Sequence, residues 1–359
     1  MMTKEKYRVL GLMSGTSLDG LDIACCSFWR KDGQWNFKIE HATTVRYNQQ
    51  WRTKLETAPT LSGEELIALD FSYGNFLGSA CATFIAKQKK IKVDFIASHG
   101  HTVFHQPGRG FTYQIGNGNA IHAVTGLPVV YDFRSLDVIN GGQGAPLVPI
   151  GDKLLFDQYD VCLNLGGIAN ISLEQKRDRI AFDVCFANMA LNMLAEKVGE
   201  AYDKNGRLAS EGEINTNLLK KMNGVYRQFA KKRPSLGREI FESKLVPFLQ
   251  GNKKDIPNLL RTCTESIAIE IVNAIRSFKK TGSVLCTGGG AFNSFLLSRM
   301  LEYGGDDITF VVPDEEIVKF KEALIFAFLG VLRVRDESNC LKTVTKARKD
   351  SSAGILVGF

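Results

Sequence analysis

The stretch "GLMSGTSLDGLD", residues 11–22, joins two apolar runs, because it overlaps the end of "YRVLGLM" and the beginning of "LDIACCSFW". Between the apolar parts lie hydroxyls, carboxylates and the glycines Gly15 and Gly20. Glycine allows a ligand to approach the backbone closely, and the N–H groups of such a turn can face an anion. The stretch is therefore interpreted as a turn between two strands, which either binds a phosphate or contains glycine for steric reasons alone.

A third strand-like run, "WNFKIEHATTVRY", follows the turn signal "KDGQ". Three strands so close in the sequence pair as antiparallel hairpins. Apolar residues at helical spacing then predict a helix over residues 63–88. After this helix come the strand "VDFIASHG", the helix "GNGNAIHAVTG" and the strand "PVVYDF". Three antiparallel strands followed by alternating helix and strand are the order of a ribonuclease-H-like unit.

The second half repeats this order after a glycine- and proline-rich loop over residues 139–152. "YDVCLNLGGIANISL" is again strand, turn and strand, "RIAFDVC", "SVLCTGGG" and "ITFVV" are further strands, and a helix is expected over 240–250. The predicted fold class is α/β, with two duplicated ribonuclease-H-like (actin-like ATPase) domains flanking a cleft. The first domain is expected over residues 1–138, to which a tail of residues 340–359 can return. The second, with helical insertions, is expected over residues 139–339.

The composition of the 359 residues, 44% hydrophobic and 23% charged, is typical of a globular protein. No apolar window is long enough to span a membrane, and the N-terminus lacks a secretory h-region. The net charge is +7, but the basic stretches "KQKKIK" and "AKKRP" are short and scattered, which favours solvated faces over a nucleic-acid footprint. The eight cysteines form no Cys-x-x-Cys pair and are expected to be buried free thiols of a cytoplasmic protein.

Several further residues have side chains that point to chemistry. The glycine turns "NLGGIAN" (164–170) and "CTGGGAFN" (286–293) could also hold phosphates or a flat ligand. Asp183 ends the strand "RIAFD", where a general base would face a cleft. The spacing of His99, His101 and His105 fits no common zinc signature, so contact with a ligand and a structural role are weighed equally. Glu322 lies on an apolar helix, where a glutamate is ordinarily the exposed partner of a nearby lysine.

A set of motifs then identifies a family. They are "GLMSGTSLDGLD", "ASHGHTVFHQP", "QIGNGNAI", "TGLPVVYDFRSLDV", "GGQGAPLVP", "LNLGGIANIS", "YDKNGRLASEG" and "CTGGGAFN", in this order over nearly the whole chain. They closely resemble the anhydro-N-acetylmuramic acid kinases. The resemblance implies the architecture of actin, hexokinase and Hsp70. It also implies an ATP-dependent reaction of peptidoglycan recycling, in which water opens the anhydro bridge of 1,6-anhydro-N-acetylmuramic acid while O6 is phosphorylated, giving N-acetylmuramic acid 6-phosphate.

The same resemblance implies roles for individual residues, and Asp183 matches the catalytic base. The expected phosphate- and nucleotide-binding residues are Gly15, Thr16, Ser17, Asp19, Gly20 and Asp22 in the opening turn, Gly166, Gly167 and Asn170 in the second turn, and Gly288, Gly289, Gly290 and Asn293 in the third. Thr102, Arg134 and Glu322 match positions that line the sugar. The implied ligands are the sugar, ATP and Mg²⁺, with no protein metal site, no nucleic acid and no membrane, and a homodimer is compatible with the family.

The chain departs from the family pattern at two places. Around the base the family usually reads Phe-Asp-Thr/Cys-Gly-Pro-Gly-Asn, whereas this chain has "FDVCFAN", residues 182–188. The loss of two glycines restricts the backbone, so Phe186 is expected either to change the turn or to crowd the sugar pocket. Asn117 stands where the family more often has Asp. The alternatives are therefore a sugar kinase of the same fold with an altered substrate, or a degenerate paralogue that binds nucleotide or sugar without turnover. A chaperone ATPase is disfavoured, because Met13 stands where actin-like ATPases and hexokinases generally carry Asp.

Overall fold

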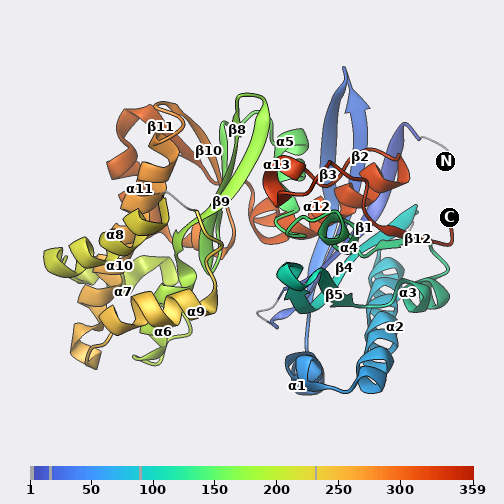
Figure 1. Ribbon diagram of the computed structural model, residues 1–359, viewed down its shortest axis with the longest axis horizontal. Coiled ribbons are helices and arrows are strands. Elements are labelled where there is room, and N and C mark those ends of the chain that lie inside the picture. The colour runs from blue at the N-terminus through green and yellow to red at the C-terminus, as the bar shows by residue number, and fades with distance from the viewer. Residues whose placement is uncertain (1–3, 16–17, 89–90, 231–232) are drawn as a thin grey trace. The chain divides into compact units, whose positions relative to one another are not determined.

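The computed structural model describes residues 4–15, 18–88, 91–230 and 233–359, so Thr16 and Ser17 of the opening turn lie outside the described residues. The chain divides into two compact units, one of residues 1–155 and 320–359 and the other of residues 156–319. Each unit has one mixed β-sheet with helices packed against it (Figure 1). Within the described ranges, none of the helices combines the length and the apolar character needed to cross a bilayer.

The sheet of the first unit has the strand order β12-β6-β4-β1-β2-β3, with β5 paired to β4. Its strands are β1 (Lys6–Ser14), β2 (Gly20–Lys31), β3 (Gln34–Arg46), β4 (Phe95–Gln106), β5 (Phe111–Ile115), β6 (Val129–Tyr131) and β12 (Ile355–Val357). Strands β1, β2 and β3 are antiparallel neighbours, whereas β4 is parallel to β1 and β6 is parallel to β4. This order is the predicted ribonuclease-H-like one and confirms the three opening strands. The strands β5 and β12 were not predicted, although the tail of residues 340–359 was expected to return to this domain.

One face of this sheet is covered by α2 (Gly63–Lys87). A capping box starts the helix, in which the side chains of Ser62 and Glu65 each accept a hydrogen bond from the other's backbone N–H. Leu77 of α2 packs with Leu12 and Ile23 of the sheet in a buried apolar core. The shorter helices of the unit are α1 (Gln49–Thr57), α3 (Gly118–Thr125), α4 (Ser135–Ile139), α5 (Val148–Leu155) and α13 (Lys342–Thr345).

The other face is covered by α12 (Glu315–Val334), which begins in the second unit and continues into the first. Gly11 of β1 permits this close packing, because an added Cβ would overlap the carbonyl oxygen of Ala323. The ring of Phe328 lies 5.4 Å from Phe28 and 5.2 Å from Trp35 between centroids. The predicted boundaries, 138/139 and 339/340, differ from the observed units, because α12 buries its apolar face on the first sheet. Residues 139–155 and 320–339 therefore group with the first unit.

The sheet of the second unit has the strand order β11-β10-β7-β8-β9. Its strands are β7 (Val161–Leu165), β8 (Ile168–Gln175), β9 (Asp178–Phe186), β10 (Gly282–Thr287) and β11 (Ile308–Val311). Strands β7, β8 and β9 are antiparallel neighbours, β10 is parallel to β7, and β11 is parallel to β10. This order matches that of β6-β4-β1-β2-β3 in the first unit, which confirms the predicted duplication, and β9 is an edge strand of the described sheet.

The helices of the second unit include one correction to the prediction. They are α6 (Asn188–Glu196), α7 (Arg207–Glu211), α8 (Thr216–Ala230), α9 (Arg238–Ile240), α10 (Ile256–Arg276) and α11 (Ser294–Gly304). The helix expected over 240–250 is instead a π-helical turn over Phe241–Leu245 and a 3-10 turn over Val246–Phe248. Pro247 has no N–H to donate, so a regular α-helix cannot continue through it. All eight cysteines are buried and free, as predicted.

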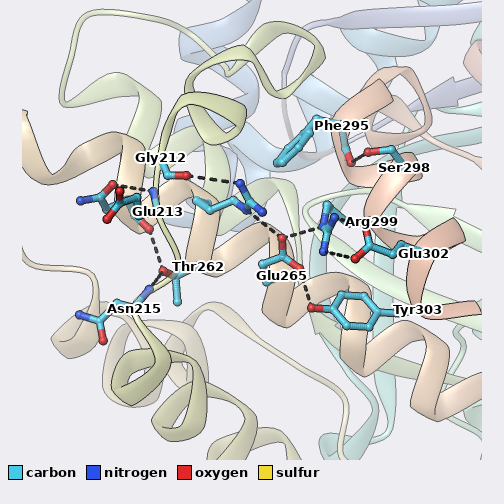
Figure 2. A network of polar contacts seen from close by, with 12 residues as sticks. Gly212, Glu213, Asn215, Thr262, Glu265, Phe295, Ser298, Arg299, Glu302 and Tyr303 are labelled. Atoms are coloured by element: carbon cyan, nitrogen blue, oxygen red, sulfur yellow. Dashed lines mark hydrogen bonds and ion pairs between the residues drawn. The ribbon is translucent and has the colours of Figure 1, made fainter.

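A buried carboxylate joins the helices of the second unit (Figure 2). Glu265 of α10 is fully buried and forms ion pairs with Arg261 at 2.8 Å and with Arg299 of α11 at 2.6 Å. The hydroxyl of Tyr303 donates to the same carboxylate at 2.7 Å, and Arg261 donates to the carbonyl oxygen of Gly212 at 3.3 Å. The network therefore holds α10, α11 and the segment that precedes α8 together.

Candidate functional site

In the second sheet, four polar residues lie directly opposite one another on neighbouring strands and form a row across the sheet. Thr287 of β10 pairs with Asn164 of β7. Asn164 in turn pairs with Asn170 of β8, and Asn170 pairs with Asp183 of β9. Directly paired residues project from the same face of a sheet. The row therefore brings two predicted site residues, Asn170 and Asp183, side by side and ends on a carboxylate at the edge strand.

Asp183, the predicted base, is half-buried and hydrogen-bonded. The backbone N–H of Leu236 donates to its Oδ2 at 2.9 Å, and the hydroxyl of Ser235 is a second hydrogen-bond partner of the carboxylate. Burial raises the pKa of Asp183 above its ordinary value, and the two hydrogen bonds oppose this rise. A carboxylate in this environment is held in place, and its affinity for a proton is higher than that of an exposed aspartate.

The altered turn after Asp183 folds into the protein interior. β9 carries a bulge directly after Asp183, where the register with β8 shifts. Beyond the bulge, Phe186 is fully buried, and its ring lies 5.2 Å from that of Phe241 between centroids. Phe186 belongs to the apolar core of the second unit. The expectation that it crowds a sugar pocket is therefore wrong, because the bulge and the core packing take the ring inward.

The first sheet carries an equivalent row. Asp22 of β2 pairs with Met13 of β1 on one side and with Thr44 of β3 on the other. The hydroxyl of Thr44 donates to Oδ1 of Asp22 at 2.6 Å. Burial raises the pKa of Asp22, the Thr44 hydrogen bond lowers it, and the nearby charge of Asp19 raises it. The opening turn thus places two carboxylates, the exposed Asp19 and the half-buried Asp22, close to each other.

The glycines of the opening turn have local structural roles. Leu18 donates its backbone N–H to the carbonyl oxygen of Gly15 at 3.4 Å, which closes the turn. Gly20 is required by packing, because an added Cβ would lie 2.7 Å from the carbonyl oxygen of Val45. Contact of this turn with a phosphate stays a prediction, and its predicted hydroxyls, Thr16 and Ser17, fall outside the described residues.

A chain of buried hydroxyls supports the residue that precedes this turn. The hydroxyls of Tyr73 and Tyr47 lie 2.6 Å apart, and Tyr47 donates to Oγ of Ser14 at 2.7 Å. Oγ of Ser14 lies 2.9 Å from Nδ1 of His101. Burial lowers the pKa of His101 to about 4, so the ring is neutral at physiological pH. Ser14 therefore links the ring of His101 to the two tyrosine hydroxyls in one buried hydrogen-bonded chain.

Arg134, which is predicted to line the sugar, is held by two other groups of the first unit. Its Nε donates to Nε2 of His99 at 2.9 Å, and its terminal nitrogen donates to the carbonyl oxygen of Gly144 at 2.6 Å. His99 in turn donates from Nδ1 to the carbonyl oxygen of Gly100 at 2.9 Å. Burial holds the pKa of His99 well below its usual range. Because His99 is neutral, it orients the guanidinium by a hydrogen bond and does not repel its positive charge.

Glu322 and Thr102 also lie in the first unit. Glu322 is exposed on α12, and its carboxylate interacts electrostatically with Arg134 and with Asp22. Thr102 lies on β4 and accepts a hydrogen bond from Nε2 of Gln114 at 3.4 Å. The structure therefore brings Asp22, Arg134 and Glu322 near one another, whereas Thr102 is hydrogen-bonded to Gln114.

Asn117, the second departure from the family pattern, is a helix cap. Its side-chain oxygen accepts from the N–H groups of Asn119 and Ala120 at the start of α3, at 3.0 and 3.4 Å. Its amide nitrogen donates to Oδ2 of Asp70 at 3.0 Å. An aspartate at this position would face the Asp70 carboxylate, so asparagine removes a repulsion between two buried or half-buried charges.

The two glycine turns of the second unit have different surroundings. The carbonyl oxygens of Gly166 and Gly167 accept from the backbone N–H groups of Asn188 and Ala187, at 3.1 and 2.8 Å. The turn between β7 and β8 is therefore tied to the start of α6. Asn188 also donates from Nδ2 to the carbonyl oxygen of Leu165 at 3.0 Å. Because these hydrogen bonds engage the carbonyl groups of the turn, they fix the direction in which the turn points.

The turn after β10 shows which of its glycines are needed for packing. Gly288 has a φ of +82°, and an added Cβ would lie 2.6 Å from Oδ1 of Asn164. An added Cβ on Gly290 would lie 2.8 Å from Cβ of Leu165. At Gly289 the nearest atom would be 3.8 Å away, an ordinary van der Waals distance. Packing explains Gly288 and Gly290, whereas a side chain at Gly289 would make only an ordinary contact.

A pocket of about 470 Å³ lies beside this turn, entirely within the second unit. Its lining includes Gly289, Gly290, Asn293, Tyr202, Lys319 and Phe292. Asn293 caps α11, since its Oδ1 accepts from the N–H of Leu296 at 3.0 Å. The ammonium of Lys319 lies 5.9 Å from the ring centroid of Phe292. Aromatic surface together with amides and a cation suits a small polar ligand with a flat group.

The predicted site omits two features, one in the same row as Asp183 and one in contact with it. Asn164 is a polar residue within the apolar run "VCLNL", and this interruption is the signal that would have identified it. The segment Arg233–Gly237 supplies the hydrogen bonds to Asp183. It belongs to a basic, proline-containing stretch that is typical of a solvated loop, so its composition gives no such signal.

Comparison with known proteins agrees with the motifs. The family described as "Anhydro-N-acetylmuramic acid kinase" matches residues 7–358. Proteins of that name from Sulfurovum sp. (strain NBC37-1) and Mannheimia succiniciproducens are each 33% identical, covering 98% and 99% of this chain and 99% of each relative. The protein of that name from Shewanella oneidensis is 34% identical and covers 98% of both chains.

Among solved structures, a ROK family glucokinase from Streptomyces griseus in complex with glucose and AMPPNP aligns with a TM-score of 0.42 and 11% identity. The alignment covers 90% of this chain and 98% of that chain, and the likeness is too weak to bear on function. The match to the family over residues 7–358 and the identities of 33–34% over nearly complete chains are decisive. The chain belongs to the anhydro-N-acetylmuramic acid kinase family.

Proposed function

We propose that the protein is an ATP-dependent kinase that acts on 1,6-anhydro-N-acetylmuramic acid. Membership of the family supports the reaction class. The observation that carries the assignment of residues is Asp183, which ends a polar row and is held by the N–H of Leu236 at 2.9 Å. A group with a raised pKa and a fixed orientation suits a general base.

In the proposed reaction, a water molecule gives a proton to the carboxylate of Asp183 while its oxygen bonds to C1 of the sugar. The bond between C1 and O6 breaks, and its electrons stay on O6. O6 then bonds to the γ-phosphorus of ATP as the bond from that phosphorus to ADP breaks. The products are N-acetylmuramic acid 6-phosphate, ADP and a protonated Asp183, which returns its proton to solvent. O6 has no proton in the anhydro bridge, so it becomes a nucleophile only as the bridge opens.

For the nucleotide, we assign the base and ribose to the pocket beside Gly289, because Phe292 offers a ring face there and Lys319 a cation. The phosphates are assigned to the opening turn, Gly15 to Asp22, and to the turn at Gly166 and Gly167. Glycine turns expose backbone N–H groups to anions. Gly289 lines the pocket and is not required by packing, which supports the close approach of a ligand at that turn.

For Mg²⁺, the described residues contain no group of three histidines, cysteines or carboxylates that could hold a metal ion by themselves. Kinases commonly bind Mg²⁺ through one or two carboxylates together with the substrate phosphates. Asp19 and Asp22 fit that requirement, because they are close enough for their charges to interact. When bound there, Mg²⁺ would neutralise charge on the phosphates.

For the sugar, we assign Arg134, Glu322 and Thr102 of the first unit. Two of the five donors of Arg134 hold His99 and Gly144, so the guanidinium is oriented before a ligand arrives. Muramic acid carries a carboxylate, and arginine is the side chain best suited to pair with it. Glu322, whose charge interacts with Arg134, is assigned to a hydroxyl of the sugar.

We further propose a cytoplasmic location, which the eight buried free cysteines support, and small molecules rather than nucleic acid as partners. The short, scattered basic stretches support the second point. A homodimer is the assembly to be tested by sedimentation of the purified protein.

The test of the function is an assay of the purified protein with ATP, Mg²⁺ and the anhydro sugar in water enriched in oxygen-18. We expect ADP release only when the sugar is present, and a sugar 6-phosphate that carries one heavy oxygen from water. N-acetylmuramic acid without the anhydro bridge is the control substrate. ADP release without a phosphorylated sugar, or a product free of heavy oxygen, would contradict the proposed reaction.

A further inference from the structure

The segment Arg233–Gly237 lies against the edge of the second sheet. The guanidinium carbon of Arg233 is 4.2 Å from the ring centroid of Phe182 and 4.6 Å from that of Phe278. Phe182 and Asp183 are consecutive residues of the edge strand β9, so their side chains leave the strand on opposite faces. The segment therefore contacts both faces of β9, through Arg233 on one and through the partners of Asp183 on the other.

Three anchors fix this segment. The first is the contact of Arg233 with the two aromatic rings. The second is the side chain of Leu236, which is 4% exposed and belongs to the apolar core of the second unit. The third is Gly237, whose carbonyl oxygen accepts from the N–H groups of Ile240 and Phe241, each at 3.1 Å, where α9 begins. Ser235 lies between the anchors, so the place of its hydroxyl is set by groups on either side.

An edge strand creates a specific problem for a carboxylate. Asn170 of β8 lies beside Asp183 on one side, whereas β9 is the last strand of the described sheet on the other. The ladder itself therefore provides polar neighbours from one direction. On the other side, the N–H of Leu236 at 2.9 Å and the hydroxyl of Ser235 take the place that a further strand would fill.

We propose that the segment Arg233–Gly237 positions the carboxylate of Asp183, with Ser235 and Arg233 as positioning residues. Ser235 acts directly on the carboxylate, and Arg233 acts through the segment. The consequence for the reaction rests on the proposed function, in which Asp183 is the base. Hydrogen bonds to a carboxylate favour its ionised form and fix the direction of its oxygens, and a base must be both ionised and aimed at the water before the reaction.

The first test is the pH dependence of kcat in Ser235→Ala, which removes one donor to the carboxylate. We expect the acidic limb of the profile to move up by about one pH unit, the size expected for a lost hydrogen bond to a charged group. KM for ATP and for the sugar should stay within about twofold of the unmodified protein, because neither ligand is assigned to this residue. Ser235→Thr, which keeps the hydroxyl, should restore the profile.

Arg233→Met tests the anchor. It keeps the length of the side chain but removes the charge over the two rings. We expect kcat to fall about tenfold with KM unchanged, because a misdirected base affects the transition state only. The matched controls are Ser243→Ala, whose hydroxyl donates to the carbonyl oxygen of Glu239, and Arg238→Met, whose partner is the exposed Glu242. Both controls should behave like the unmodified protein.

The second readout does not need activity. In protein labelled with carbon-13 at the aspartate carboxyls, the Asp183 signal is identified by its loss in Asp183→Asn. Its titration midpoint should be higher in Ser235→Ala than in the unmodified protein and unchanged in Ser243→Ala. Equal midpoints would overturn the inference, whatever the kinetics show. Absence of sugar phosphorylation by the unmodified protein would instead overturn the proposed function, and the titration would still decide whether Ser235 holds the carboxylate.

Discussion

Five strands of each sheet share one order, and each sheet carries one carboxylate in the corresponding row of paired residues. In the first sheet that carboxylate is Asp22, on the interior strand β2, where Thr44 of the neighbouring strand donates to it at 2.6 Å. In the second sheet it is Asp183, one strand further along the row, on the edge strand β9. Its donors come from a segment outside the sheet, at Ser235 and Leu236.

This difference shows how a duplicated scaffold can acquire two distinct sites. In both units, strand pairing fixes which residues lie opposite one another in the row. The strand that bears the carboxylate then determines which groups surround that carboxylate. An interior position has strands on both sides, so the partners of Asp22 are built into the sheet. An edge position is open on one side, so Asp183 takes donors from a segment outside the sheet. The proposed roles, phosphates at Asp22 and proton transfer at Asp183, follow this division.

The largest expected effect comes from Asp183→Asn, which removes the carboxylate from the edge row. Turnover should fall by about 10²–10⁴-fold, the usual range for a lost general base. Binding of ATP and of the sugar, measured by calorimetry, should be nearly unchanged, because the amide keeps the shape of the side chain. Near-normal turnover in this variant would remove the functional distinction between the two rows.

The corresponding change in the first row, Asp22→Asn, should have a smaller effect of a different kind. Activity should fall by about 10–10²-fold, as is common when a group that supports a bound metal is removed. Raising the Mg²⁺ concentration should recover part of the loss, whereas it should not help Asp183→Asn. Asp94→Asn, in an exposed ion pair with Lys4, is the control. A defect in Asp22→Asn that is insensitive to Mg²⁺ would argue against the proposed role.

The third prediction separates packing glycines from a ligand-facing glycine. Gly290→Val should lower the free energy of unfolding by about 1–3 kcal/mol, because the added atoms overlap Leu165. Gly289→Ala should leave the urea unfolding curve nearly unchanged, since the nearest atom would be 3.8 Å away, but should raise KM for ATP. If Gly289→Ala is neutral in both measurements, the nucleotide is not bound at this turn.

The smallest expected effect is that of Thr44→Val, which removes the donor to Asp22 while keeping the side-chain shape. Because that hydrogen bond lowers the pKa of Asp22, its loss should raise the titration midpoint, by about half a pH unit or less at this exposed threonine. Carbon-13 titration of the Asp22 carboxyl measures the shift. A larger shift than in Ser235→Ala would reverse the expected order of the two sites.

The strands and their duplication could be predicted because their signals are local. Apolar runs joined by short turns specify hairpins, and the glycine turn of residues 11–22 has a counterpart in "NLGGIAN". The unit to which α12 belongs could not be predicted in this way, since an apolar helix face does not specify the sheet that will cover it. Its one indication is Gly11, a glycine inside a strand, which marks a close approach.

The surroundings of the candidate base could not be predicted from the sequence for a similar reason. Arg233 meets Phe182 and Phe278, which lie about fifty residues away in either direction along the chain, so no short motif records the contact. The identity of Asp183 itself came from its place at a strand end and from the family pattern. The bulge that turns Phe186 into the core depends on packing with Phe241, which is equally distant in the sequence.

The first unit is built from both ends of the chain, and this affects the order of events during synthesis on a ribosome. Domains generally fold in the order in which they emerge. Here the second unit has all of its residues once Lys319 has been made, whereas the first sheet still lacks α12 and β12. The part that is translated first is therefore completed last. Until then, the face of the nascent sheet around Gly11 and Phe28 stays uncovered and is the surface that chaperones would meet.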